Sequence, residues 1–292
     1  MPGFEEVYED FPFHPLFIES IKIYNTIRFM GWQNTNGVSY GDWKLRSRKG
    51  FTRSFSSSAE VNGVASGGFS VSIEYMILLA NTIGANAWFN IPHLATDEYI
   101  ENFAIMVRDT LRPDVQVYLE YSNEVWGTLF PGGQYAQSQG LKMGLSKSAT
   151  TARFCYYILR SNQIFTIWKN VFGATNSTIK LHFIIASQAV NPDVTKQMLA
   201  CSTFNKSTSL VTSIAIAPYF GNYNPKIDLN IDVFMNTTLP QQIKQLSTSV
   251  SGHYSFARSA SFDLLTYESG QGLQGSGGNL ALLANRLIYI VK

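Results

Sequence analysis

The stretch VYLEYSNEVW, from Val117 to Trp126, is the most informative part of this 292-residue chain. An apolar run of β-branched and aromatic residues stops abruptly there at the dipeptide Asn123-Glu124. A second apolar run, FDLLTYESG from Phe262 to Gly270, also ends on one carboxylate, Glu268. Short apolar runs of this composition are typical of strands. The pattern therefore predicts two carboxylates at the ends of two separate strands.

Helical and strand-like periods alternate along the rest of the chain. Apolar residues recur at helical spacing in Phe69–Ile83, Asp97–Leu111 and Ala149–Phe172. Strand-like runs lie at Thr26–Phe29, Trp88–Ile91, Val115–Tyr121, Ile179–Ile185, Ser213–Ala217 and Phe262–Tyr267. This alternation predicts an α/β fold with a parallel sheet, either doubly wound or closed. Polar or aromatic residues follow nearly every strand, which favours a barrel with one central mouth over an open sheet. We predict a single (β/α)8 TIM-barrel domain over residues 1–292.

The composition favours a carbohydrate partner. Charged residues make up 14% of the chain and aromatic residues also 14%, where about 25% charged residues is usual. The formal net charge is +2, and the densest basic stretch, Lys44–Arg53, is short and isolated. We therefore expect no nucleic-acid partner. We also expect no membrane span, because no apolar run reaches about 18 residues.

Three sequons suggest a secreted glycoprotein. They begin at Asn176, Asn205 and Asn236, in polar stretches that we expect to be loops. The N-terminus is acidic and does not resemble a signal peptide. Cys155 and Cys201 are too few for a disulfide framework. One bridge and two buried thiols both remain open, and buried thiols are favoured.

The strand ends, together with the segments RFMGWQNTN and NIPH, resemble the retaining glycoside hydrolases of clan A. The (β/α)8 barrels of that clan carry an Asn-Glu pair after the fourth strand and a second Glu after the seventh. If Thr26–Phe29 is strand two, Asn123-Glu124 follows strand four and Glu268 follows strand seven. The segments are more closely similar to a group of little-characterised, extracellular relatives of the clan. The resemblance covers nearly the whole chain and implies about six full strands, with strands one and eight missing and the domain truncated at both ends.

The resemblance implies that this chain is a retaining O-glycoside hydrolase of β-linked poly- or oligosaccharides. Glu124 would be the acid/base and Glu268 the nucleophile, with their carboxyl groups about 5–5.5 Å apart. Asn123 would hydrogen-bond the sugar hydroxyl beside the reacting carbon. We expect Arg28 to lower the pKa of Glu268 by its charge, and Tyr219 to donate a hydrogen bond to Glu268.

Further side chains are candidates for substrate binding. His93 would add a polar contact, and Trp32, Trp126 and Tyr219 would be platforms for the apolar faces of sugar rings. Each has a structural alternative: Arg28 and His93 can serve as hydrogen-bonding residues of the fold, and a tryptophan is more often core. Glu124 alone could cap a helix.

Two observations concern other functions. Gly31 stands where the resemblance leads us to expect Asp, which makes a non-catalytic carbohydrate-binding relative the alternative function; a plain structural domain is a third. The segment Gly270–Gly275 fits the dinucleotide pattern G-x-G-x-x-G, but no Asp or Glu follows Glu268, so we discount a dinucleotide. No zinc or calcium signature is present, and we expect no cofactor or metal. The sugar, its linkage and the oligomeric state do not follow from the sequence.

Overall fold

The computed structural model describes residues 12–49, 60–61, 64–65, 70–175, 177–205, 209–222 and 230–271. Six parallel strands alternate with helices, as in an incomplete (β/α)8 barrel, which confirms the predicted fold class. The strands, in chain order, are β1 (Thr26–Arg28), β4 (Asn86–Ile91), β5 (Val117–Tyr121), β6 (Leu181–Ser187), β7 (Ser213–Ile216) and β9 (Asp263–Thr266). Strands β1, β4, β5 and β6 pair in this order, and β7 pairs with β9. Each overlaps one of the runs predicted from the sequence.

The predicted helices are also present, as α2 (Ile73–Ile83), α3 (Asp97–Thr110) and α5 (Ala149–Gly173). Their ends follow local chemistry. The hydroxyl of Thr96 accepts a hydrogen bond from the backbone N–H of Tyr99 and caps α3, as N-cap threonines do. Gly84, with a left-handed φ of 67°, ends α2, a position that favours glycine.

The chain divides into two compact units. The first lies within Met1–Ile185 and Ala200–Thr212, and the second within Ala186–Leu199 and Ser213–Lys292. Strands β1, β4 and β5 and most of β6 belong to the first unit, and β7 and β9 belong to the second.

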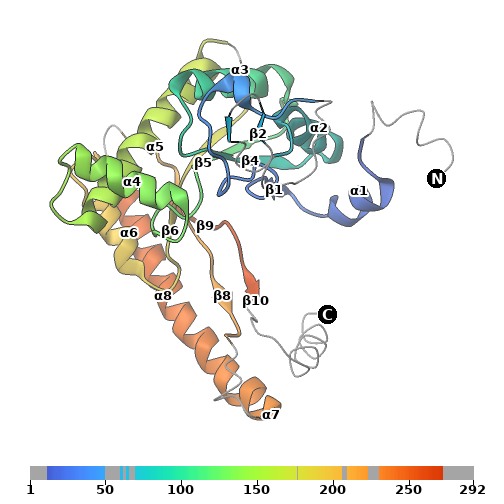
Figure 1. Ribbon diagram of the computed structural model, residues 1–292. Helices are drawn as coiled ribbons and strands as arrows, with labels where there is room; N and C mark the ends of the chain where they lie inside the picture. The colour runs from blue at the N-terminus through green and yellow to red at the C-terminus, as the bar shows by residue number, and fades with distance from the viewer. Residues whose placement is uncertain are drawn as a thin grey trace. The chain divides into compact units, whose positions relative to one another are not determined.

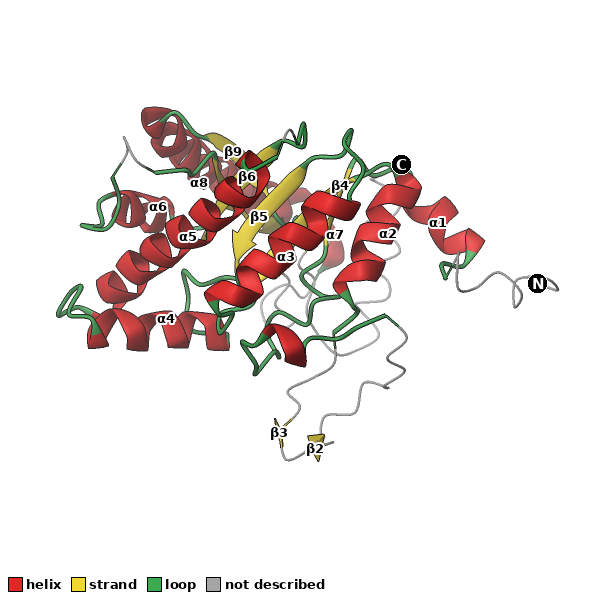
Figure 2. Ribbon diagram, turned by 90° about the horizontal axis from the view of Figure 1, so that it is seen from above, coloured by secondary structure: helices red, strands yellow, loops and turns green. Residues whose placement is uncertain are grey.

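One face of the first unit's strands is apolar and is covered by helices. The register places Phe89 beside Leu119, and Leu119 beside Phe183. The ring of Phe89 packs against Phe103 of α3 at 5.1 Å and against Trp168 of α5 at 6.5 Å between centroids. Helices α2, α3 and α5 lie over strands β4 and β5 in both views (Figures 1 and 2). This packing forms the core of the first unit.

The opposite face of the same strands is polar, because side chains alternate along a strand. This polar face is formed by Arg28, Trp88, Asn90, Tyr118, Glu120 and His182. One row across four strands is stacked: the Trp88 ring lies 5.6 Å from that of Tyr118, which lies 4.4 Å from His182. Arg28 lies over the Trp88 ring at 5.7 Å. The polar face is thus ordered by ring stacking.

Several smaller elements complete the first unit. They are α1 (Pro15–Ile21), η1 (Trp43–Leu45), α4 (Pro131–Lys142) and the antiparallel pair β2 (Glu60–Val61) and β3 (Val64–Ala65). Helix α4 packs on α5. It was not predicted, because its segment PGGQYAQSQGLK contains three glycines and no apolar stripe.

The second unit contains the long helix α8 (Leu239–Ala260), which packs against α6 (Pro192–Leu199) and β9 (Figure 1). Two short helical segments, α7 (Ile231–Val233) and η2 (Phe234–Thr238), precede α8. Strand β8 (Tyr219–Phe220) pairs in parallel with β10 (Gly270–Gln271). Gly270 and Gln271 thus form a short strand, although they begin a glycine-rich segment.

The sequons have different environments. Asn205 is exposed in a loop, as expected. Asn236 is exposed but lies inside η2, so the expected loop is wrong there; this helical turn continues directly into α8 at Leu239. Asn176 lies outside the described residues.

Cys155 and Cys201 are buried, free thiols, as favoured from the sequence. Within the described ranges, no helix has the length and hydrophobicity needed to cross a membrane.

Candidate active site

The Asn123-Glu124 dipeptide lies in a strained turn directly after β5. The backbone φ is 58° at Ser122 and 49° at Glu124, so the residues on both sides of Asn123 have a left-handed conformation. This conformation is unfavourable for residues other than glycine, by about 1–2 kcal/mol each. Such strain persists only where the surroundings hold it, and it is common at functional sites.

Polar side chains from neighbouring segments hold this turn. The N–H of Ser122 donates to the carbonyl of Ile91 at 2.8 Å, and the Asn90 side-chain amide donates to the Ser122 carbonyl at 2.7 Å. Gln33 exchanges two hydrogen bonds with the backbone of Asn90, at 2.8 and 2.7 Å. The end of β5 is therefore fixed to β4 and to the segment after β1.

The first residues of α4 pack tightly under the turn. A Cβ on Gly132 would lie 2.5 Å from the hydroxyl oxygen of Ser122, and one on Gly133 would overlap the carbonyl of Gly127. Only glycine allows this approach. The Gly-Gly pair thus brings the N-terminus of α4 directly against the candidate catalytic turn.

A buried ion pair lies beside the turn, on the polar face. Arg28 donates from Nε and Nη2 to Oε2 of Glu120, at 3.1 and 3.0 Å, and from Nη2 to Oε1 at 3.1 Å. The Trp88 indole N–H donates to the same Oε2 at 2.9 Å. The Glu120 side chain has no exposed surface and that of Arg28 is 10% exposed. Burial raises the pKa of Glu120, and the charge and hydrogen bonds of Arg28 oppose this rise. N–H groups of Arg28 and Trp88 donate all four hydrogen bonds, so the carboxyl group of Glu120 acts only as an acceptor, as a carboxylate does.

The same guanidinium orients Asn123. Arg28 Nη2 donates to Oδ1 of Asn123 at 2.9 Å, and Nδ2 of Asn123 donates to Oδ1 of Asn36 at 3.2 Å. The amide is therefore held at both ends. An amide nitrogen carries two N–H groups, so Asn123 can donate to a ligand while it keeps Asn36.

Glu120 and Trp88 are residues that the sequence analysis missed. Glu120 lies inside the apolar run that predicted β5, and Trp88 begins the strand-like run that predicted β4. A signal was present in Glu120, because a carboxylate within a buried strand is costly unless a cation pairs with it. Arg28, at the end of another predicted strand, is such a cation.

In the structure, His93 contacts other residues of the fold. The residue is 7% exposed, and burial lowers its pKa, which favours the neutral ring. Its backbone carbonyl accepts a hydrogen bond from the Tyr121 hydroxyl at 3.1 Å, and its ring meets that of Tyr135 edge-on at 5.6 Å. A role of His93 in substrate binding stays a prediction.

The two tryptophans proposed as platforms are both half-buried. Trp32 is stacked on Phe17 at 6.2 Å and also lies 5.8 Å from the Phe29 ring. One ring face of Trp32 is thus already covered, which favours its structural alternative. The buried indole N–H of Trp126 has no hydrogen-bond partner among the described residues.

In the second unit, Glu268 lies two residues after β9. The N–H of Tyr267 donates to the Ile216 carbonyl at 3.0 Å, which fixes the start of this segment to β7. The pairing of β8 with β10 places Tyr219 opposite Gly270. The Tyr219 hydroxyl donates to Oε2 of Glu268 at 2.9 Å, which confirms the hydrogen bond predicted from the sequence. Glu268 is half-buried and Tyr219 is 46% exposed.

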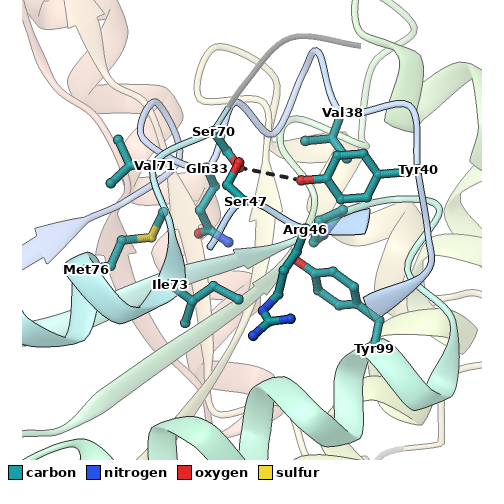
Figure 3. Close-up of a pocket in the computed structure, with 11 residues that line it drawn as sticks. Gln33, Val38, Tyr40, Arg46, Ser47, Ser70, Val71, Ile73, Met76 and Tyr99 are labelled. Atoms are coloured by element: carbon teal, nitrogen blue, oxygen red, sulfur yellow. Dashed lines mark hydrogen bonds between the residues drawn. The ribbon is translucent and has the colours of Figure 1, made fainter. Parts of the chain in front are cut away.

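Figure 3 shows a small cavity elsewhere in the first unit, lined by Tyr40, Arg46, Ser70 and Tyr99, among others. The volume open to the centre of a water molecule is about 10 Å³, close to that of one water. This cavity is too small for a sugar ring. Among the described residues, no cluster of three His, Cys, Asp or Glu side chains could hold a metal ion.

Comparison of the chain with models of protein families, with curated proteins and with solved structures found no match. The catalytic and binding roles of the named residues therefore stay predictions.

Proposed function

We propose that this protein is a retaining O-glycoside hydrolase that acts on β-linked poly- or oligosaccharides. The observation that carries the proposal is the arrangement at the end of β5. A strained turn presents Glu124, and Arg28 orients the Asn123 amide directly before it. The hydrogen bond from Tyr219 to Glu268 gives further support, because it holds the carboxyl group of Glu268 in a defined position.

The proposed mechanism gives the two carboxyl groups different tasks. Glu124 protonates the glycosidic oxygen as the bond to the sugar breaks, while Glu268 attacks the anomeric carbon and forms a covalent glycosyl ester. Glu124 then removes a proton from water, which hydrolyses the ester with net retention. This sequence requires carboxyl groups about 5–5.5 Å apart. Asn123 would donate its second N–H to the hydroxyl beside the reacting carbon, a contact that strengthens in the transition state.

The first test is activity on a panel of aryl β-glycosides and β-linked polysaccharides. We expect turnover by the wild type and a loss of about 100-fold or more in Glu124→Ala and Glu268→Ala. Glu98→Ala is the matched control, because Glu98 is an exposed glutamate of α3; its turnover should equal that of the wild type. Equal turnover in all four proteins would exclude the proposed roles.

Added azide separates the two roles. In Glu268→Ala, azide can replace the nucleophile and give an α-glycosyl azide. In Glu124→Ala, azide can attack the glycosyl ester and give a β-glycosyl azide. The α and β products are distinguished by proton NMR. An α-azide from Glu124→Ala and a β-azide from Glu268→Ala would make Glu124 the nucleophile and Glu268 the acid/base. A 2-deoxy-2-fluoro-β-glycoside should also lose its leaving group and add the mass of its fluoroglycosyl group to the peptide that contains Glu268.

A non-catalytic carbohydrate-binding protein is the second candidate. A Cβ on exposed Gly31 would meet no other atom within 4 Å among the described residues. Packing therefore does not require glycine where the resemblance leads us to expect Asp. Retention on insoluble β-glucan, xylan or mannan without any turnover would favour this second candidate.

A further inference from the structure

We propose that Glu120 is a positioning residue of the candidate active site: it fixes the guanidinium of Arg28, which in turn orients Asn123. This inference rests on the proposed function. Glu120 would not touch the substrate. Its effect would pass through Arg28, whose Nη2 contacts both Glu120 and Asn123.

Glu120 is the fixed end of the series of contacts that runs from Glu120 through Arg28 to Asn123. Its side chain is fully buried, on the next-to-last residue of β5, and the indole N–H of Trp88 in β4 donates to its Oε2. The guanidinium of Arg28 meets this carboxylate through two nitrogens, Nε and Nη2. A planar, two-nitrogen contact fixes the orientation of a guanidinium as well as its position. Strands β1, β4 and β5 supply one member each and lie side by side (Figure 1).

The position of Asn123 depends on this orientation. Its Oδ1 accepts from Arg28, and that contact determines which end of the amide presents N–H groups. Without Glu120, the Arg28 guanidinium loses its contacts with this carboxylate and can rotate away from Asn123. Nδ2 would then lose its fixed direction toward a sugar hydroxyl. A displacement of about 1 Å in a positioning contact can cost about 100-fold in rate.

A buried carboxylate at this position is otherwise hard to explain. Burying an ion pair costs desolvation that a hydrophobic pair of similar volume avoids. The other face of β5 is apolar and lies against α5, so an apolar side chain would be ordinary for such a strand. The carboxylate is accounted for if the site requires a fixed guanidinium.

The test is a double-mutant cycle on kcat and KM between Glu120→Gln and Asn123→Ala, measured on the aryl β-glycoside that the wild type hydrolyses fastest. We expect each single variant to lower kcat by about 100-fold, with a smaller change in KM. The double variant should be little slower than either single variant, because residues that act as one unit are not additive. Multiplied losses in the double variant would overturn the proposal. Glu120→Asp, which keeps the charge, should recover part of the lost kcat and covers the case in which Glu120→Gln does not fold.

A second measurement needs no substrate. The side-chain Nε–H of Arg28, followed by nitrogen-15 NMR, should exchange slowly with water in the wild type and in Asn123→Ala. It should exchange fast in Glu120→Gln, and slow exchange there would overturn the proposal. If the wild type hydrolyses none of the panel, the proposed function fails, and the fixing of Arg28 by Glu120 is judged by this signal alone.

Discussion

We predict that Arg28 of β1 and Glu120 of β5, which form a buried ion pair, are strongly coupled in their contributions to the free energy of unfolding. We consider Arg28→Met, Glu120→Leu and the double variant. Because the side chains are 10% and 0% exposed, each single variant removes the opposite charge from beside a buried charged group. Such a loss typically costs about 3–5 kcal/mol, so two independent losses would sum to about 8 kcal/mol.

The double variant removes both charges and should be less damaging than that sum. It leaves the indole N–H of Trp88 and the side-chain Oδ1 of Asn123 without these contacts, at about 1–3 kcal/mol each, or about 4 kcal/mol together. The cycle therefore predicts a coupling energy of about 4 kcal/mol, which is above the range of about 0.5–3 kcal/mol usual for residues in contact.

Urea denaturation followed by tryptophan fluorescence can measure this coupling. All five tryptophans of the chain lie in the first unit, so their fluorescence reports the unfolding of that unit alone. The matched control is Glu19 and Lys22, an ion pair in which both side chains are more than half exposed, at 67% and 52%. Its coupling should be about 0.5 kcal/mol or less. A coupling below about 1 kcal/mol for Arg28 and Glu120 would refute the reasoning.

Three further predictions follow from the structure. Glu124→Gly should be more stable than Glu124→Ala by about 1 kcal/mol in urea, because glycine relieves the φ of 49°; equal stability would exclude this strain. Burial lowers the pKa of His253 below 6.5, although hydrogen bonds to the Gln188 and Ala189 carbonyls oppose the shift. The unfolded chain therefore binds the proton first as the pH falls below 6.5, and stability should decline from there until the folded protein also titrates. In thermal melts between pH 7.5 and 5, His253→Asn should flatten this decline, whereas the control His14→Asn, at an exposed position, should not. When the protein is secreted from eukaryotic cells, exposed Asn205 should carry a glycan, and mass spectrometry should show that Asn205→Gln lacks the mass of this glycan. A wild type without the added mass would show that Asn205 is not glycosylated.

Elements with strong periodicity could be predicted from the sequence, and elements with weak periodicity could not. Helix α3 carries a regular apolar stripe, which buries Tyr99, Ile100, Phe103, Ala104 and Val107. Helix α8 is rich in serine and glutamine, and its buried residues are only Leu239, His253, Ala257 and Ala260. Tertiary packing against α6 and β9, rather than a local pattern, accounts for α8.

The position of the candidate catalytic turn was predictable, but its surroundings were not. The apolar run ends at Tyr121, so Asn123-Glu124 had to follow a strand. The partner of Arg28 depends on strand register, which no local pattern specifies. Parallel pairing aligns Arg28 with Trp88 and Asn90 with Glu120, and this non-local alignment turns a carboxylate in an apolar run into a buried ion pair.

The unusual features at the end of β5 argue together for a functional site. A carboxylate lies inside a buried strand, two non-glycine residues are left-handed, and a Gly-Gly pair begins the next helix. Each departs from what a sequence optimised for stability would contain. Several such departures in one place are expected at a functional site, because function can maintain their cost. Arg28, Asn90 and Gln33 supply the offsetting hydrogen bonds, so the strain and its support come from different segments and both serve the position of Asn123-Glu124.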